Sequence, residues 1–421
     1  MIILSVNQIN NLRICINRFR QDFDQLSKIG ATEDQGVSRV AFSESHLDAR
    51  KWFARRITEA GLELYIDGAG NHSGIYRCNL PDSPTLLLGS HLDTVPTGGK
   101  YDGALGVLAA LEVLRCVKET NLNLPFNLEA IDFTDEEGTM VSVLGSLALC
   151  GLLKPADLEN PSGNKDDFTV GLKRAGLSIE SILSAKRSPS SVAGYLELHV
   201  EQGHLLEESG DQIGVVTSIT GITLNRVSYH GEAGHAGTTD MRKRRDAAQG
   251  AAAFTLAARR LILDKFPECT SNVGAIEFSP GAYNVIPQLA TLGIEFRAGD
   301  ESTRSKLNEA LTFEAREVAE RFKLDFTYEL IEEVPAAMMN ERVMNAIHAS
   351  ASMLGLKHRN IVSRAGHDAQ PISTICPTGM IFVPSVNGIS HSPLEYTAWQ
   401  DCVNGANVLL HSVLHLANNF H

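Results

Sequence analysis

Histidine and acidic side chains that could bind metal ions recur along this chain of 421 residues. They are His91 in SHLDT, Asp102 in YDG, Glu137 in TDEEG, His199 in LELHV and His391 in NGISHSP. Imidazole and carboxylate ligands without thiolates suit Zn²⁺, Mn²⁺ or Co²⁺ rather than a structural cysteine site. The two oxygens of Asp102 can bridge two ions, with His91 and His199 beside one ion and Glu137 and His391 beside the other. We therefore predict the outline of a two-metal hydrolase site.

Two more acidic residues adjoin these candidates. Because Glu136 and Glu137 are adjacent, one can bind a metal while the other takes a proton from the attacking water. Asp93 follows His91 by two residues, so it would point the same way along an extended chain and hold the other N–H of that imidazole. Taken singly, such histidines, Glu-Glu pairs and Asp-Gly turns are usually structural or solvated. Only the joint spacing favours a catalytic site.

The predicted ligands follow apolar runs that have the length of β-strands. We expect strands at 85–88, 127–133, 195–200 and 379–383, with helices at 104–117 and 401–416. Such alternation is typical of an α/β fold with a doubly wound, mainly parallel sheet. In open sheets of this kind the ligand crevice lies where the strands end, so the candidate residues are expected to converge there.

A segment of different character interrupts this pattern. Residues 214–330 begin with a β-rich stretch, continue with a helix near 246–264 and strands at 273–278 and 290–296, and end with a helix at 301–322 and a strand at 326–330. This order suits a small α+β sandwich inserted into the larger domain. We predict a metal-binding catalytic domain formed by residues 1–213 and 331–421, and an inserted lid or dimerisation domain at 214–330.

Composition excludes several classes of protein. The net charge of −13 repels phosphate backbones and argues against a nucleic-acid partner. No apolar run approaches the roughly 18 residues of a membrane span. The seven cysteines form no C-x-x-C pair, and the apolar run at 1–6 is too short for a signal peptide. We therefore expect a cytoplasmic protein with reduced thiols.

Several motifs together resemble one known family. They are GSHLDTVPTGGKYDGALGV, TDEEG, LELHVEQG, HAGTTDMRKRRDAA, NVIP and NGISHSP. The set is similar to the hydantoinase/carbamoylase branch of the M20-type dizinc amidohydrolases, which includes N-carbamoyl-L-amino acid amidohydrolases and allantoate amidohydrolases. The resemblance extends from about Gly36 to the end of the chain.

The resemblance implies roles for individual residues. It implies two divalent metal ions held by His91, Asp102, Glu137, His199 and His391, with Asp102 as the bridging ligand. It makes Glu136 the general base, which later protonates the leaving nitrogen. His235 matches a histidine that the inserted domain of the partner subunit supplies to polarise the scissile carbonyl, which implies a homodimer. Further residues match substrate-binding positions of the family: Gln202, Asn284, Arg297 and Gly366. Gly366 lies within the turn 365–368, and Arg297 would pair with a carboxylate.

Three departures from the family pattern bear on the substrate. The loop after TDEEG reaches Gly145-Ser146 two residues early, so the loop beside the metals is altered. Allantoate-cleaving members carry an arginine pair where this chain has Ile222-Thr223-Leu224 after Gly221. Arg364 stands where relatives commonly have glycine, which adds a cation near the substrate-carboxylate end and would shift the preference toward acidic substrates.

These observations predict hydrolysis of an N-carbamoyl-L-amino acid to the amino acid, ammonia and CO₂. Alternatives at the same site are hydrolysis of allantoate or N-carbamoyl-β-alanine and deacylation of an N-acyl amino acid. A dipeptidase fits less well, because Arg297 and Asn284 suit a short carboxylate. A non-catalytic binding protein on a hydrolase scaffold is the alternative from another class.

Overall fold

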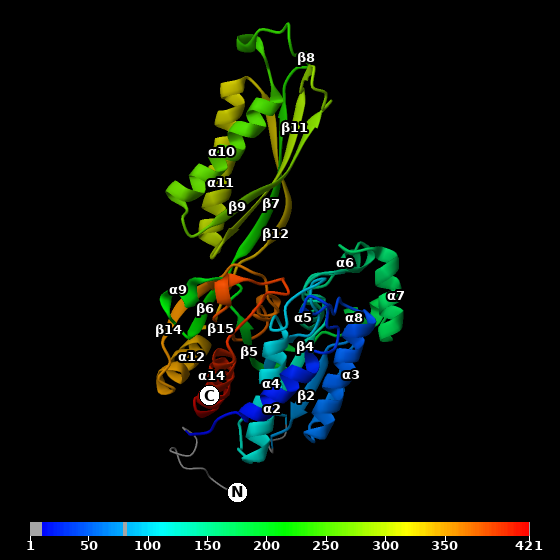
Figure 1. The fold of residues 1–421 in the computed structure, drawn as a ribbon, viewed down its shortest axis with the longest axis vertical. Coiled ribbons are helices and arrows are strands. Elements are labelled where there is room, and N and C mark those ends of the chain that lie inside the picture. Colours follow the sequence, from blue (N-terminus) through cyan, green and yellow to red (C-terminus); the bar gives the residue numbers. More distant parts are fainter. Residues whose placement is uncertain (1–10, 79–81, 421) are drawn as a thin grey trace. The chain divides into compact units, whose positions relative to one another are not determined.

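The computed structural model describes residues 11–78 and 82–420. The chain divides into two compact units (Figure 1). The first comprises residues 1–217, 339–361 and 365–421, and the second comprises residues 218–338 and 362–364. The second unit is therefore an insertion, and it extends beyond residue 330 because its last long strand continues to Val334.

The first unit is built on a sheet whose central strands are parallel. From one edge the order is β1 (Glu63–Ile66), β2 (His72–Tyr76), β4 (Asn127–Phe133), β3 (Thr85–His91), β5 (Val192–Val200), β15 (Thr378–Val383) and β6 (Ile213–Ile219). The pairs β4–β3, β3–β5 and β5–β15 are parallel, and the flanking pairs are antiparallel. Strand β14 (His358–Ser363) also pairs with β6.

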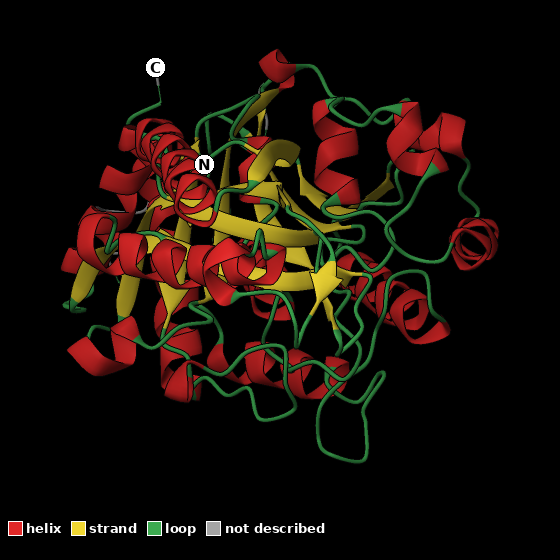
Figure 2. Ribbon diagram, turned by 90° about the horizontal axis from the view of Figure 1, so that it is seen from above, coloured by secondary structure: helices red, strands yellow, loops and turns green. Residues whose placement is uncertain are grey.

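Helices cover both faces of this sheet (Figure 2). One core contains α2 (Ile16–Leu26), α3 (Glu44–Glu59), α4 (Ala104–Glu119), α12 (Glu341–Met353) and α14 (Trp399–Asn418). On the other side α5 (Leu144–Cys150) and α13 (Ala369–Ile372) contact strands β4, β5 and β15. All seven residues of β4 are buried, as expected for a strand covered on both faces.

Short helices border the same unit. They are α6 (Pro155–Glu159), α7 (Lys165–Ala175), α8 (Ile179–Leu183) and α9 (Leu205–Ser209). None of the helices in the described part of the chain is long and apolar enough to cross a membrane.

The second unit contains an antiparallel sheet of order β12 (Asp325–Val334), β7 (Gly221–His230), β11 (Leu289–Ala298) and β9 (Thr270–Ser279). Alternate residues of β11 are buried against α10 (Ala247–Lys265) and α11 (Glu301–Phe322). A short ribbon of β8 (Gly234–His235) and β10 (Val285–Ile286) lies at one end of this unit (Figure 1). The short strand β13 (Ala337–Met338) pairs with the end of β6. The predicted fold class, a mainly parallel α/β sheet with a separate α+β domain, is confirmed.

Candidate metal centre and active site

The predicted metal ligands lie at the carboxyl ends of the parallel strands in the first unit. His91 is the last residue of β3, and His199 is the penultimate residue of β5. Glu137 follows β4 in a loop, and His391 lies in the loop that leaves β15. Asp102 occupies the turn before α4. The convergence expected from the strand order is therefore what the structure contains.

Asp102 lies between two groups of potential ligands. Its Oδ1 is 3.0 Å from Nε2 of His199 and 3.6 Å from Nε2 of His91. Its Oδ2 is 3.4 Å from Nε2 of His391, and that nitrogen is 3.3 Å from Oε2 of Glu137. Each group could hold a metal ion, and Asp102 belongs to both. One oxygen of Asp102 thus faces each group, which is the arrangement of a bridging carboxylate.

In His91 and His199, contacts of Nδ1 with backbone carbonyl oxygens leave Nε2 as the nitrogen that can bind a metal ion. Nδ1 of His91 lies 3.0 Å from the backbone carbonyl oxygen of Asp93, and Nδ1 of His199 lies 2.8 Å from that of Val200. If Nδ1 carries the proton in each ring, Nε2 presents a lone pair toward Asp102 and can bind a cation.

The charges of the site fit divalent cations. Burial, together with the nearby carboxylates of Asp102 and Asp93, raises the pKa of Glu137 to about 9. Burial opposes ionisation of Asp102 as well, but the adjacent imidazoles of His199 and His391 hold the pKa of Asp102 well below its usual range. A dication would relieve this crowding of buried acids, and the donors are those that Zn²⁺, Mn²⁺ and Co²⁺ accept.

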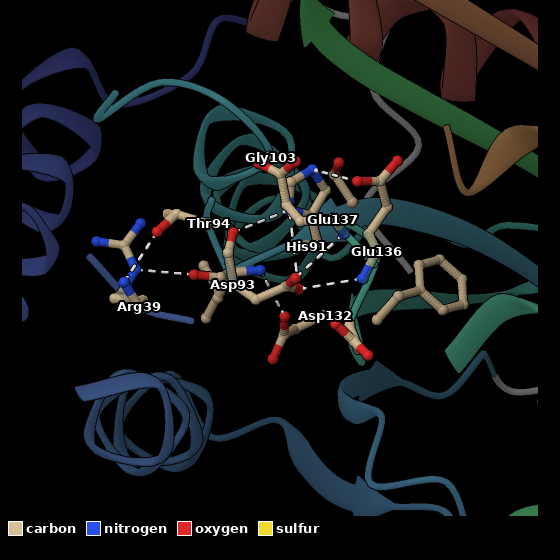
Figure 3. A network of polar contacts seen from close by, with 12 residues as sticks. Arg39, His91, Asp93, Thr94, Gly103, Asp132, Glu136 and Glu137 are labelled. Carbon is tan, nitrogen blue, oxygen red and sulfur yellow. Dashed lines mark hydrogen bonds and ion pairs between the residues drawn. The ribbon is translucent and has the colours of Figure 1, made fainter. Parts of the chain in front are cut away.

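Asp93 supports the two glutamates rather than the imidazole (Figure 3). Its carboxylate accepts hydrogen bonds from the backbone N–H of Glu136 at 3.3 Å and of Glu137 at 3.2 Å. Its nearer carboxylate oxygen is 3.9 Å from Nδ1 of His91, too far for a hydrogen bond. The expected contact with His91 is made by the backbone of Asp93 instead, because the chain turns after β3 and carries the carboxylate toward the Glu136 loop.

Glu136 lies beside the ligand groups without belonging to either. Its Oε2 is 3.5 Å from Nε2 of His91, and the residue is 9% exposed. Burial, followed by the negative charges of Asp368 and Glu137, raises the pKa of Glu136 well above its ordinary value. A buried carboxyl with a strong affinity for a proton is suited to accept one from a reacting water.

The loop after Glu137 is closed by Asp135. The carboxylate of Asp135 accepts hydrogen bonds from the hydroxyl of Thr139 and from the backbone N–H of Met140 and Val141, the last at 2.6 Å. Asp135 itself has a left-handed backbone with φ +54°. These bonds account for how the loop turns back into α5.

Gln202, expected to be a substrate-binding residue, lies beside Asp102. Its side-chain N–H donates to Oδ2 of Asp102 at 2.9 Å, and its buried Oε1 has no hydrogen-bond partner in the described structure. Gly366 is exposed and precedes His367, whose ring packs against that of His199 at 4.5 Å between centroids.

The remaining candidates lie in the second unit, where the structure separates them. His235 on β8 pairs with Val285, the residue after Asn284, and the carbonyl oxygen of Asn284 accepts a hydrogen bond from the N–H of Ala236 at 3.0 Å. Both His235 and Asn284 are exposed. Arg297 lies at the opposite end of β11, where its guanidinium pairs with Glu295 at 2.8 Å and donates to the carbonyl oxygen of Arg364 at 2.8 Å.

Two further buried acids lie near the centre: Glu395, which was not predicted, and Asp368, which was predicted only as part of the turn 365–368. Glu395 accepts a hydrogen bond from the backbone N–H of Asp102 at 3.0 Å. Asp368 accepts one from the hydroxyl of Ser146 at 2.6 Å, and its other oxygen has no hydrogen-bond partner in the described structure. The sequence offers little signal for either acid, because their partners lie more than 200 residues away.

Comparison with known proteins identifies close relatives over the whole chain. An N-carbamoyl-L-amino acid amidohydrolase of Geobacillus stearothermophilus is 36% identical over 95% of this chain and 98% of its own length. A ureidoglycolate hydrolase of Arabidopsis thaliana is 33% identical over 96% of this chain and 87% of its own. An allantoate amidohydrolase of Bacillus subtilis is 34% identical over 95% of this chain and 98% of its own. The crystal structure of a hydantoinase/carbamoylase family amidase from Burkholderia multivorans has a TM-score of 0.86 at 31% identity and covers 96% of this chain and 98% of that chain.

The fold, the site and these relatives define a hydrolase that acts on C–N amide bonds. The sequence profile of Peptidase family M20/M25/M40 matches residues 87–415, and the chain belongs to this family. The resemblance noted in the sequence is therefore confirmed.

Proposed function

We propose that this protein is a dinuclear-metal amidohydrolase that cleaves the carbamoyl C–N bond of an N-carbamoyl-L-amino acid. The products would be the amino acid, ammonia and CO₂. The observation that carries the proposal is the position of Asp102, whose two oxygens face two separate groups of potential ligands. Glu136 lies beside His91 of the first group, belongs to neither group, and would be free to exchange a proton.

Two divalent cations would polarise the substrate carbonyl and make water a stronger nucleophile at neutral pH. The chain would hold them through His91, His199, Asp102, Glu137 and His391. Glu136 would accept a proton as water adds to the ureido carbon, and would return it to the amino-acid nitrogen as the C–N bond breaks. The released carbamate would decompose to ammonia and CO₂. Asp93 would keep Glu136 and Glu137 in place through their backbone amides.

Residues of the second unit would complete the site. His235 would donate to the oxygen on which negative charge develops, and loss of such a donor typically lowers the rate by about 10² to 10³. Asn284 would hold the substrate, and Arg297 would bind its carboxylate.

Distances within the second unit support a homodimer. Leu289 of β11 pairs with His230, close to the ribbon that carries His235, whereas Arg297 lies at the other end of the strand. Eight residues of extended strand span about 27 Å, which is longer than a carbamoyl amino acid. One copy of this unit therefore cannot place His235 and Arg297 on the same small substrate. We propose that His235 and Asn284 act on the site of a partner subunit.

The choice of substrate rests on β7 and on the relatives. Ile222 and Leu224 are half-buried and apolar where allantoate-cleaving members carry arginines, and Thr223 is buried beside Arg304, to whose guanidinium its hydroxyl is bonded at 2.6 Å. This favours a carbamoyl amino acid, the substrate class in the name of the Geobacillus relative, over allantoate. All seven cysteines lie within the described residues and none of them is in a disulfide there, which supports the proposal of a cytoplasmic protein.

The proposal is tested by substrate profiling of enzyme reconstituted with Zn²⁺, Mn²⁺ or Co²⁺. The panel contains N-carbamoyl-L-amino acids with apolar, polar and acidic side chains, N-carbamoyl-β-alanine, allantoate, ureidoglycolate and N-acetyl amino acids, with release of ammonia or amino acid as the signal. We expect the highest kcat/KM for an N-carbamoyl-L-amino acid. A preference for allantoate, ureidoglycolate or an N-acyl amino acid would assign the site to that alternative.

Glu136→Gln separates chemistry from binding. This variant should bind metal as the wild type does and lose nearly all turnover, because the amide cannot take the proton. Full activity of the variant would contradict the role of Glu136. Absence of bound metal together with absence of turnover on every substrate would instead favour a binding protein on a hydrolase scaffold.

A further inference from the structure

We propose that Glu395 is a positioning residue that sets the separation of the two halves of the metal centre. It would act by joining the turn of Asp102 to the loop of His391. The inference rests on the proposed dinuclear centre and extends it to a residue outside the ligand groups.

One oxygen of Glu395 holds the turn that carries the bridging ligand. Its Oε1 accepts hydrogen bonds from the backbone N–H of Tyr101 and of Asp102, both at 3.0 Å. Two amide donors on one carboxylate oxygen orient the peptide of Asp102, and thereby the direction in which its side chain leaves the backbone.

The other oxygen holds the loop of the histidine ligand. Oε2 of Glu395 accepts a hydrogen bond from the hydroxyl of Ser390 at 2.8 Å. Ser390 precedes His391, and its hydroxyl is also 3.3 Å from Oδ2 of Asp102. Glu395 thus links two ligands that are 289 residues apart in the sequence.

His391 needs such support because its own surroundings fix it weakly. Its side chain is 51% exposed, whereas the side chains of His91 and His199 are 1% exposed. His391 also has a left-handed backbone with φ +52°, which an L-residue adopts only when neighbouring contacts hold it there.

Glu395 is itself rigidly placed. The residue is 5% exposed. A Cβ atom at Gly99 would lie 2.1 Å from Oε1 of Glu395, so the chain at Gly99 packs directly against the carboxylate. Because its two oxygens already accept three hydrogen bonds, and because Glu395 lies outside both ligand groups around Asp102, its carboxylate serves to position ligands rather than to bind metal.

The test is a stepwise titration of metal-free protein with Co²⁺, followed by visible absorption and calorimetry. His391→Ala identifies the signal of the ion in the Asp102, Glu137 and His391 group. For Glu395→Ala we expect that ion to bind about 10- to 100-fold more weakly, while the ion at His91 and His199 changes by less than about 3-fold. Glu395→Gln preserves the shape and an acceptor for the two amides, and should recover most of the affinity.

Two further variants isolate the linkage. Ser390→Ala removes the hydroxyl that joins Glu395 to the His391 loop, together with its longer contact of 3.3 Å to Asp102, and should weaken the same ion without lowering the melting temperature of the metal-free protein, even if Glu395→Ala fails to fold. Glu207→Ala is the matched control. The exposed carboxylate of Glu207 holds the same loop through the N–H of Asn387 at 2.7 Å, but no hydrogen bond or ion pair to Asp102 is found for it in the described structure. It should leave both Co²⁺ affinities unchanged.

The possible failures are distinguishable. If the wild-type protein does not bind two ions, the proposed dinuclear centre is wrong. If the wild type binds two ions but Ser390→Ala and Glu395→Ala leave both affinities unchanged, or weaken both equally, Glu395 is only a structural residue and the inference is overturned.

Discussion

The imidazole of His91 lies directly against Gly103. A Cβ atom at Gly103 would stand 2.5 Å from Nδ1 and from Cε1 of that ring, and the backbone of Gly103 has φ +62°. Gly103 follows Asp102, the proposed bridging ligand, and is the N-cap of α4. The turn can bring the Asp102 carboxylate beside His91 only because no side chain intervenes.

Gly103→Ala should therefore displace His91 and weaken metal binding. Gly210→Ala is a matched control, because Gly210 has φ +68° and a Cβ atom added there would meet no described atom within 4 Å. The control should cost about 1 kcal/mol of folding stability through its backbone alone and retain activity. Gly103→Ala should lose metal affinity and most of kcat/KM in addition, as measured by calorimetry and initial rates. Equal behaviour of the two variants would contradict the steric role of Gly103.

Mixed dimers test which subunit supplies His235. Glu136→Gln lacks the proposed base and His235→Ala lacks the proposed oxyanion donor, so each variant alone should be nearly inactive. If His235 acts on the partner's site, mixing and re-forming dimers restores one complete site in each mixed dimer. Random pairing should then recover roughly a quarter of wild-type activity per subunit.

The control for this experiment is a mixture of Glu136→Gln with the double variant that also carries His235→Ala. It contains no complete site in either arrangement and should stay inactive. If the first mixture shows no recovery while its subunits demonstrably exchange, His235 acts within its own chain.

Arg297 and Arg364 should affect substrate binding differently. Arg297→Ala removes the proposed partner of the substrate carboxylate and should raise KM about 100-fold while changing kcat little. Arg364 is exposed, and its carbonyl oxygen is bonded to Arg297. Arg364→Ala should raise KM mainly for substrates with an acidic side chain. A uniform change across substrates would show that Arg364 does not select for charge.

His72 should make the protein less stable in mild acid. Burial, together with the charge of Arg50, lowers the pKa of His72 to about 3. Below the unfolded value of about 6.5 the unfolded chain binds a proton that the folded protein does not, so stability falls as the pH falls. Over the pH unit from 6.5 to 5.5 this histidine would account for at most about 1.4 kcal/mol of the loss, and its partial contact with solvent makes the loss smaller.

Urea unfolding of His72→Gln between pH 7.5 and 5.5 measures this contribution. The variant should lose less stability than the wild type over that range. His204→Gln, which removes an imidazole whose side chain is 61% exposed, is the comparison variant at the surface. An identical slope for His72→Gln and the wild type would show that His72 does not titrate in this way.

The sequence by itself determined the class of fold and the candidate ligands. The segment 127–133 has the length of a strand and was predicted with the observed bounds of β4, and residues that follow parallel strands must meet at one edge of the sheet. The elements before Thr85, among them α3 and β2, were not predicted. Their apolar residues are mixed with charged ones, such as Arg50, which is buried because it pairs with Asp132 at 3.0 Å.

Only the tertiary structure decided how the ligands are held. The sequence spacing predicted that the Asp93 carboxylate would contact the His91 ring. Because the chain turns after β3, this carboxylate instead accepts hydrogen bonds from the backbone N–H groups of Glu136 and Glu137. The hydrogen bond between Glu395 and Asp102 joins residues that are 293 positions apart, and no repeating pattern of residue types in the sequence indicates such a pair. Hydrogen bonds of this kind depend on where the folded backbone brings donors and acceptors together, so residue type and spacing cannot specify them in advance.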